Sequence, residues 1–98
     1  MTTSKPVYQI WLLGYGEFGD CTEFTYQVSE HENLNDAKDV FNIIKNKGLN
    51  ILKTNDPDFY IPADTYSVSV VIEEVIVDEN ENEECVDFVE ENYIQVRL

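Results

Sequence analysis

The residues of this chain with the clearest chemical potential are carboxylates that gather in one segment. The chain holds 20 acidic residues against 6 lysines and arginines, which gives a formal net charge of −14. Half of the acids lie within residues 73–91, and that stretch contains no lysine or arginine. Such a surface attracts basic partners and repels nucleic acid and anionic membranes. The predicted partner-binding residues are the ten acids of this segment: Glu73, Glu74, Asp78, Glu79, Glu81, Glu83, Glu84, Asp87, Glu90 and Glu91.

Residue types that support catalysis or transition-metal binding are few. His31 is the only histidine, and Cys21 and Cys85 are the only cysteines. A cysteine–histidine pair can activate a nucleophile, but His31 lies between two glutamates, a position typical of a solvated surface residue. Zinc sites of the structural type use four cysteine or histidine ligands, more than this chain can supply without a carboxylate. We therefore predict a protein that is not an enzyme and has no catalytic residue, cofactor or metal site.

One acidic motif copies a calcium-binding loop in part. Asp78-x-Asn80-x-Asn82 matches the start of an EF-hand loop. Glu83 and Val89 stand where that loop has glycine and glutamate, and strand patterns rather than helices flank it. We therefore interpret residues 79–84 as a polar connection between two strands.

A glycine-rich segment follows the first apolar stretch. Residues 14–19 have the G-x-G-x-x-G spacing of dinucleotide-binding loops, but that site needs a helix next, and a strand pattern follows. Together with Leu13, the segment resembles the glycine-rich loop of protein kinases, which lies between two strands. It departs from that pattern at Cys21, where kinases have valine, and no lysine follows in the next strand. We interpret it as a hairpin loop, in which glycine supplies positive φ angles.

Alternating polarity predicts the strands. Residues 7–13 are apolar on both faces, as in a strand in the middle of a sheet or under a helix. Residues 22–29 alternate between apolar and polar side chains, which is typical of a half-buried strand. A long strand is expected over residues 65–78, with a bulge or bend near Glu73-Glu74 where the alternation breaks. The last strand is expected over residues 85–97, where Glu90-Glu91-Asn92 interrupts the pattern and could split the strand in two.

Residues 34–47 change period and predict an amphipathic helix. Apolar side chains recur there at spacings of three and four residues. Asn33 precedes the segment as a candidate N-cap, and Gly48 follows it at the usual position for a helix end. After the helix, residues 49–53 suggest a short strand, and the proline- and aspartate-rich residues 54–64 suggest an irregular loop.

These elements predict one α+β domain over residues 1–98. Its sheet is expected to be antiparallel, with four to five strands in the chain order β-β-α-(β)-β-β and one amphipathic helix packed on one face. The chain has the length of one ordinary domain. Its N-terminus lacks the apolar segment of a signal peptide, so a cytoplasmic location is expected.

The charge distribution predicts the function. Like charges on facing strands destabilise a sheet, so stability alone would not choose the acidic segment. We predict a non-catalytic acidic binding protein that occupies a basic surface of a partner, most concretely a nucleic-acid mimic that inhibits a DNA- or RNA-handling protein. In size and composition it is similar to the small acidic inhibitors with which phages block restriction or CRISPR nucleases. The expected partner is thus a basic nucleic-acid-binding protein, with no direct contact to nucleic acid or membrane.

An alternative remains open. The chain could be a protein–protein interaction or assembly module whose acidic face serves solubility. Residues 65–72 are long and rich in β-branched side chains, so an unpaired edge there would allow a homodimer by strand addition.

Overall fold

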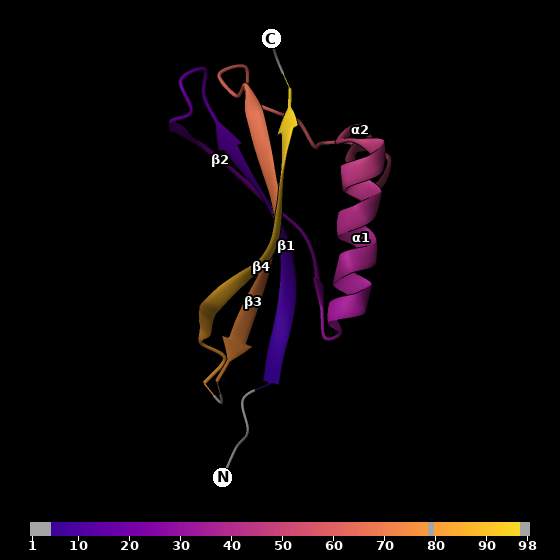
Figure 1. Ribbon diagram of the computed structural model, residues 1–98, viewed down its shortest axis with the longest axis vertical. Helices are drawn as coiled ribbons and strands as arrows, with labels where there is room; N and C mark the ends of the chain where they lie inside the picture. The colour runs from indigo at the N-terminus through magenta and orange to yellow at the C-terminus, as the bar shows by residue number, and fades with distance from the viewer. Residues whose placement is uncertain (1–4, 79, 97–98) are drawn as a thin grey trace.

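A computed structural model of the protein describes residues 5–78 and 80–96, which form an α+β structure. Within these residues, a four-stranded antiparallel sheet has the strand order β2-β1-β3-β4, and both helices lie on one side of it (Figure 1). The α+β class and the antiparallel sheet are confirmed, whereas the expectation of a single helix is wrong. The elements are β1 (Lys5–Tyr15), β2 (Cys21–His31), α1 (Leu34–Lys47), α2 (Asn50–Asn55), β3 (Ser67–Val77) and β4 (Glu83–Gln95).

The glycine-rich segment closes the hairpin between β1 and β2, as predicted. The Gly16 amide donates to the Asp20 carbonyl at 2.7 Å, and Gly19 has a φ of 80°. Gly14 is needed for another reason, because the two strands approach closely there. A Cβ atom on Gly14 would lie 2.9 Å from the Cβ of Phe24, and it would also clash with the Thr22 hydroxyl.

The core lies between the sheet and α1. It is built on β1 and β3, the two central strands, each of which contributes completely buried side chains to it. The prediction that residues 7–13 form a strand in the middle of the sheet is confirmed. From the helical layer, α1 contributes Ala37, Phe41 and Ile44. The buried strand residues of this core are Ile10, Leu12, Val68, Val70 and Ile72.

Helix α1 begins and ends where the sequence predicts. The Asn33 side chain accepts a hydrogen bond from the Asn35 amide at 2.8 Å and so caps the first turn. Gly48, with a φ of 82°, donates its amide to the Ile44 carbonyl at 2.8 Å and ends the helix.

The predicted short strand over residues 49–53 is wrong, because this segment belongs to the helical layer as α2. Leu49 and Leu52 are both buried in the core, and their separation of three residues places them on the same side of a helical turn. In a strand, an odd separation would have pointed them to opposite faces. Burying both side chains therefore requires a helical turn here.

Strand β3 is central, which contradicts the suggestion that residues 65–72 form a free edge. It pairs with β1 on one side and with β4 on the other, so the edges of the sheet are β2 and β4. The predicted irregularity near Glu73-Glu74 is confirmed, since the β3–β4 register shifts on both sides of this pair. The last strand begins at Glu83, two residues earlier than predicted, and the break expected near Glu90 does not end it.

The molecule is elongated, with a longest dimension of 52 Å. Helix α1 has 14 residues and is therefore about 21 Å long, too short to cover the whole sheet. Among the described residues of the β3–β4 hairpin, the core that packs against the helices includes β3 only as far as Ile72 and β4 only from Val89 onward, although Val75 is buried on the helix-free face. Between these points the hairpin extends past the core. Of the helices described, neither is long and apolar enough to cross a membrane.

Candidate functional site: the acidic hairpin

The predicted partner-binding acids lie on the β3–β4 hairpin, mainly on the part that extends past the core. Glu79 lies outside the described residues. Glu73 and Glu74 are partly buried in β3, and the other seven are exposed. The exposed acids are Asp78 and Glu81 at the tip, and Glu83, Glu84, Asp87, Glu90 and Glu91 along β4.

The acids of β4 are divided between the two faces of the sheet. Residues directly opposite each other on paired strands share a face. Glu90 lies opposite Ile72 and so faces the helix side, whereas Glu91 lies opposite Val71 and faces the helix-free side. Glu84 and Glu83 divide in the same way. The edge strand therefore presents carboxylates on both faces, rather than one uniformly acidic face.

Direct opposition of two acids across the hairpin is limited to one pair among the described residues. Glu74 lies opposite Asp87, whereas Glu83, Glu84, Glu90 and Glu91 each lie opposite an apolar residue of β3. The repulsion expected between facing strands is thus concentrated at a single position.

A buried glutamine ties the hairpin to the other strands. Gln9 of β1 is only 3% exposed, and its side-chain amide donates to Glu30 at 2.9 Å and to Glu83 at 3.3 Å. Its carbonyl oxygen accepts from the Trp11 indole at 2.9 Å. Glu83 belongs to β4, which β3 separates from β1 in the sheet. The contact with Gln9 therefore requires the start of β4 to curl over the helix-free face towards β1. Glu83 therefore has a structural contact in addition to its charge.

Glu73 and Cys85 form a second polar contact on the helix-free face. Burial raises the pKa of Glu73, and a hydrogen bond from the Cys85 thiol opposes that rise. Burial, together with the charge of Glu73, raises the pKa of the Cys85 thiol in turn. A raised pKa reduces the thiolate fraction, so Cys85 is a poor nucleophile at neutral pH.

The tip of the hairpin shows what the partial calcium motif does. The Asp78 carboxylate accepts hydrogen bonds from the backbone amides of Asn80 and Asn82, each at 2.9 Å. Glu81 adopts a φ of 64°, a left-handed conformation that non-glycine residues rarely take. The Asp78 carboxylate thus holds a turn, as Asp side chains often do. Across residues 5–78 and 80–96, no cluster of three or more His, Cys, Asp or Glu side chains is placed to hold a metal ion.

The structure does not bring a cysteine and the histidine together on β2. Cys21 and His31 occupy opposite ends of this strand, about 33 Å apart at the usual rise per residue. The His31 ring is instead hydrogen-bonded to the Ser29 hydroxyl, with a separation of 2.8 Å.

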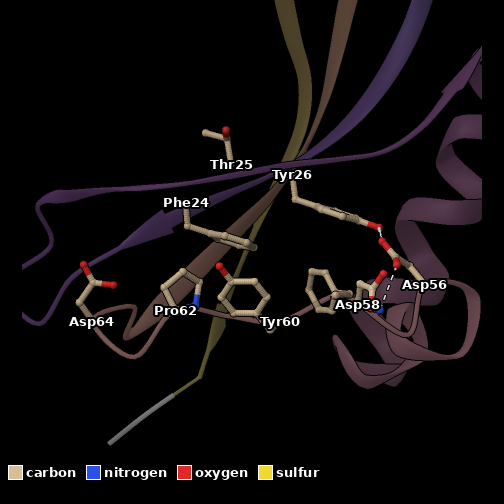
Figure 2. Close-up of a pocket in the computed structure, with 9 residues that line it drawn as sticks. Phe24, Thr25, Tyr26, Asp56, Asp58, Tyr60, Pro62 and Asp64 are labelled. Atoms are coloured by element: carbon tan, nitrogen blue, oxygen red, sulfur yellow. Dashed lines mark hydrogen bonds between the residues drawn. The ribbon is translucent and has the colours of Figure 1, made fainter.

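A pocket lies at the opposite edge of the sheet, where the sequence predicts an irregular loop over residues 54–64. Its volume is about 510 Å³, and it is formed between β2 and residues 56–64. Phe24 and Tyr26 of β2 extend towards the loop, whereas the Thr25 side chain points away (Figure 2). The alternation of β2 signals an inward-facing aromatic pair, but its pairing with a loop some 30 residues later is a tertiary contact.

The loop side of the pocket is anchored by Phe59. This side chain is 5% exposed, and its ring centroid lies 4.9 Å from that of Tyr26 and 6.3 Å from that of Phe24. The Tyr26 hydroxyl donates to the Asp56 carboxylate at 2.9 Å. Burial, followed by the contact with Asp56, raises the pKa of Tyr26, so the hydroxyl remains a proton donor at neutral pH.

Comparison with other proteins adds no assignment to either region. No protein-family model, curated protein sequence or solved structure matches the chain. The function must therefore be inferred from the charge and geometry of the chain itself.

Proposed function

We propose that the protein is a non-catalytic binding protein that occupies a basic surface of a partner, and that it does so as a nucleic-acid mimic. The observation that carries this proposal is the exposed acidic edge strand β4 on a hairpin that extends past the core. Such an edge is accessible to a partner without rearrangement of the fold.

The spacing of the carboxylates supports mimicry of a phosphate backbone. Residues 83–91 hold five acids, and they span about 27 Å at a rise of about 3.4 Å per residue, somewhat less with the bulges. One DNA strand carries a phosphate about every 3.4 Å along the helix axis. The charge density of β4 is therefore a little over half that of a DNA strand. Because the carboxylates occupy both faces, the binding site that fits them best is a basic groove with two walls.

The distribution of the basic side chains is consistent with this arrangement. The four described lysines outside the first strand, Lys38, Lys45, Lys47 and Lys53, all belong to the two helices. The molecule therefore has charge asymmetry, and electrostatic steering would orient the hairpin towards a basic partner. Binding of this kind is expected to be fast and sensitive to salt.

The test uses two variants of equal net charge. In the hairpin variant, Glu84, Glu90 and Glu91 are replaced by glutamine. In the matched control, Glu17→Gln, Glu32→Gln and Asp39→Asn remove three exposed acids from other regions. Each full-length protein is immobilised and exposed to a bacterial lysate, and bound proteins are identified after elution with salt or duplex DNA.

The proposal expects the wild type and the control to retain DNA- or RNA-handling proteins that duplex DNA displaces, and the hairpin variant to lose them. It is contradicted if the hairpin variant retains the same proteins, if duplex DNA displaces nothing, or if the wild type retains no such protein.

A second candidate function rests on the helix-free face of the sheet. Phe88 and Tyr93 are 51% and 61% exposed, and the Tyr93 ring lies 5.8 Å from the ring of Tyr15. Exposed aromatic residues are common in protein interfaces. An assembly module, including a homodimer, would use this face, and its association would persist at high salt. Light scattering of the isolated protein at low and high salt separates this function from the first.

A further inference from the structure

The pocket between β2 and residues 56–64 lies at the sheet edge farthest from the acidic strand β4. It has a size typical of ligand-binding pockets. The nine residues that line it are Phe24, Thr25, Tyr26, Asp56, Asp58, Phe59, Tyr60, Pro62 and Asp64.

The charge of the lining selects a cation. Three aspartates contribute to it, and none of the lining residues that the structure describes is a lysine or arginine. An anionic ligand would be repelled by these carboxylates. A bare metal ion is a poor fit as well, because the described residues contain no grouping of side chains able to hold one. Among charged ligands, an organic cation therefore fits this lining best.

The arrangement of rings and carboxylates indicates which kind of organic cation fits the pocket. Asp56 and Asp58 lie at one end of the row of rings and Asp64 at the other, with Phe24, Tyr60 and Pro62 between them (Figure 2). Aromatic faces attract cations, and the carboxylates can accept hydrogen bonds from N–H groups of a ligand. A quaternary ammonium ion satisfies the rings but offers no N–H donor. A guanidinium group satisfies both, because it is flat, stacks on rings and carries five N–H donors in its plane.

The Asp56 carboxylate is held in position by its hydrogen bonds. Asp56 accepts from the Tyr26 hydroxyl at 2.9 Å through one oxygen and from the Asp58 amide at 3.1 Å through the other. The Phe59 amide donates to the Asp56 carbonyl at 3.0 Å, which fixes the loop backbone at the same point. The Asp58 and Asp64 side chains are exposed to solvent and accessible to a ligand.

We propose that this pocket binds a guanidinium group, with the flat cation stacked on the aromatic rings and its N–H groups directed to Asp58 or Asp64. The proposal is independent of the acidic hairpin, since it concerns the other edge of the sheet. The group can belong to a small molecule or to an arginine side chain of a polypeptide, and the two sources are distinguished experimentally.

The test is a titration of the isotopically labelled full chain, followed by amide NMR signals. The probe is Nα-acetyl-arginine methylamide, and its matched control is the corresponding citrulline derivative, which has the same shape and no charge. We expect the arginine probe to shift the signals of the lining residues with saturable, millimolar affinity, and the citrulline derivative to leave them unchanged. Equal shifts with both compounds, or shifts located away from the pocket, would overturn the proposal, as would the absence of shifts.

Two variants test the proposed contacts. Tyr60→Leu removes a ring that is 70% exposed, and Asp58→Asn removes an exposed charge, so neither is expected to disturb the fold. Each should weaken binding of the arginine probe by about two- to fivefold. Phe18→Leu and Asp39→Asn are the matched controls, because Phe18 is 91% exposed and both residues lie outside the pocket. Equal weakening by the controls would also overturn the proposal.

The source of the guanidinium group is tested with agmatine and with a capped Gly-Gly-Arg-Gly peptide. Tighter binding of the peptide indicates an arginine in a polypeptide, whereas equal or tighter binding of agmatine indicates a small molecule. In both cases the guanidinium group is the part of the ligand that binds in the pocket.

Discussion

The two edges of the sheet use the same residue type in different ways. Along β4, carboxylates project on both faces of an exposed strand. At the β2 edge, three aspartates surround aromatic rings in a pocket of about 510 Å³. The first arrangement spreads charge over an extended surface, and the second concentrates it around one small volume.

This difference shows that acid content alone does not describe the electrostatics of the protein. A distributed row of charges acts at long range and is screened by salt. A pocket with rings beside its carboxylates acts at contact distance, where partial removal of water strengthens the interaction. The two edges should therefore respond differently to substitution, to pH and to salt.

The largest expected effect is on the free energy of unfolding, and it shows how differently the side chains are packed at the two edges of the sheet. Phe59→Ala should lower the free energy of unfolding by about 3–5 kcal/mol, because it removes a buried ring that packs on Phe24 and Tyr26. Phe88→Ala removes a ring that is half exposed on the acidic hairpin, and it should change this free energy by no more than about 0.5 kcal/mol. Urea unfolding of both variants measures the difference, and similar losses would mean that the two edges are packed alike.

A smaller effect on stability distinguishes the roles of individual acids in the hairpin. Asp78→Ala should lower the free energy of unfolding by about 1–2 kcal/mol, because the turn loses a carboxylate that accepts two backbone amides. Asp78→Asn keeps an accepting oxygen and should lose much less. Asp87→Asn should instead raise stability by a few tenths of a kcal/mol, since it relieves the repulsion with Glu74.

These three variants are compared by thermal and urea unfolding at low salt. Equal effects of Asp78→Ala and Asp78→Asn would contradict a hydrogen-bonding role for this carboxylate. A loss of stability in Asp87→Asn would contradict the repulsion assigned to the facing acids.

The smallest effect depends on pH. Burial raises the pKa of Glu73, so the folded chain holds this proton more tightly than the unfolded chain does. The contribution of Glu73 to the free energy of unfolding therefore falls as the pH rises from about 4.5, the ordinary pKa of glutamate, through its raised pKa in the folded chain. Glu73→Gln should be more stable than the wild type at pH 7, and the gain should disappear below about pH 4. Unfolding measured across this range provides the check, and a gain that is constant with pH would contradict the assignment.

The same substitution should change the chemistry of Cys85. The charge of Glu73 contributes to the raised pKa of this thiol. Glu73→Gln should therefore increase the rate of Cys85 alkylation at neutral pH, with the exposed Cys21 in the same chain as the internal control. An unchanged rate ratio between the two thiols would show that the charge has no influence on Cys85.

Most of the fold could be predicted because its signals are local. The period of α1, its cap at Asn33 and the glycine after its last turn lie within one segment. The alternation of β2 and the turn chemistry of residues 14–19 are also local. The failure at residues 49–53 has a physical reason. The spacing of Leu49 and Ile51 matches the two-residue period of a strand, whereas the spacing of Leu49 and Leu52 matches a helical turn. A segment of five residues is too short to distinguish these two periods.

The candidate sites could be predicted less completely. The concentration of acids on one hairpin follows from the sequence, whereas the faces they occupy depend on two shifts of the strand register. The contact of Glu83 with Gln9, and the burial of Glu73, depend on how the hairpin curls over the sheet. Such contacts join residues that are far apart in the sequence, so the pattern of neighbouring residues does not indicate them.

The sequence by itself determined the sheet-forming segments, the capped helix α1 and the concentration of negative charge in one hairpin, because periodicity, capping and composition are properties of short stretches of chain. Only the tertiary structure decided that β3 is central, that residues 50–55 are helical and that β2 meets the loop of Phe59 to form a pocket. These features depend on which distant surfaces bury one another. Which surfaces pack together is decided by the packing of the whole core, and it cannot be derived from any single segment of the chain.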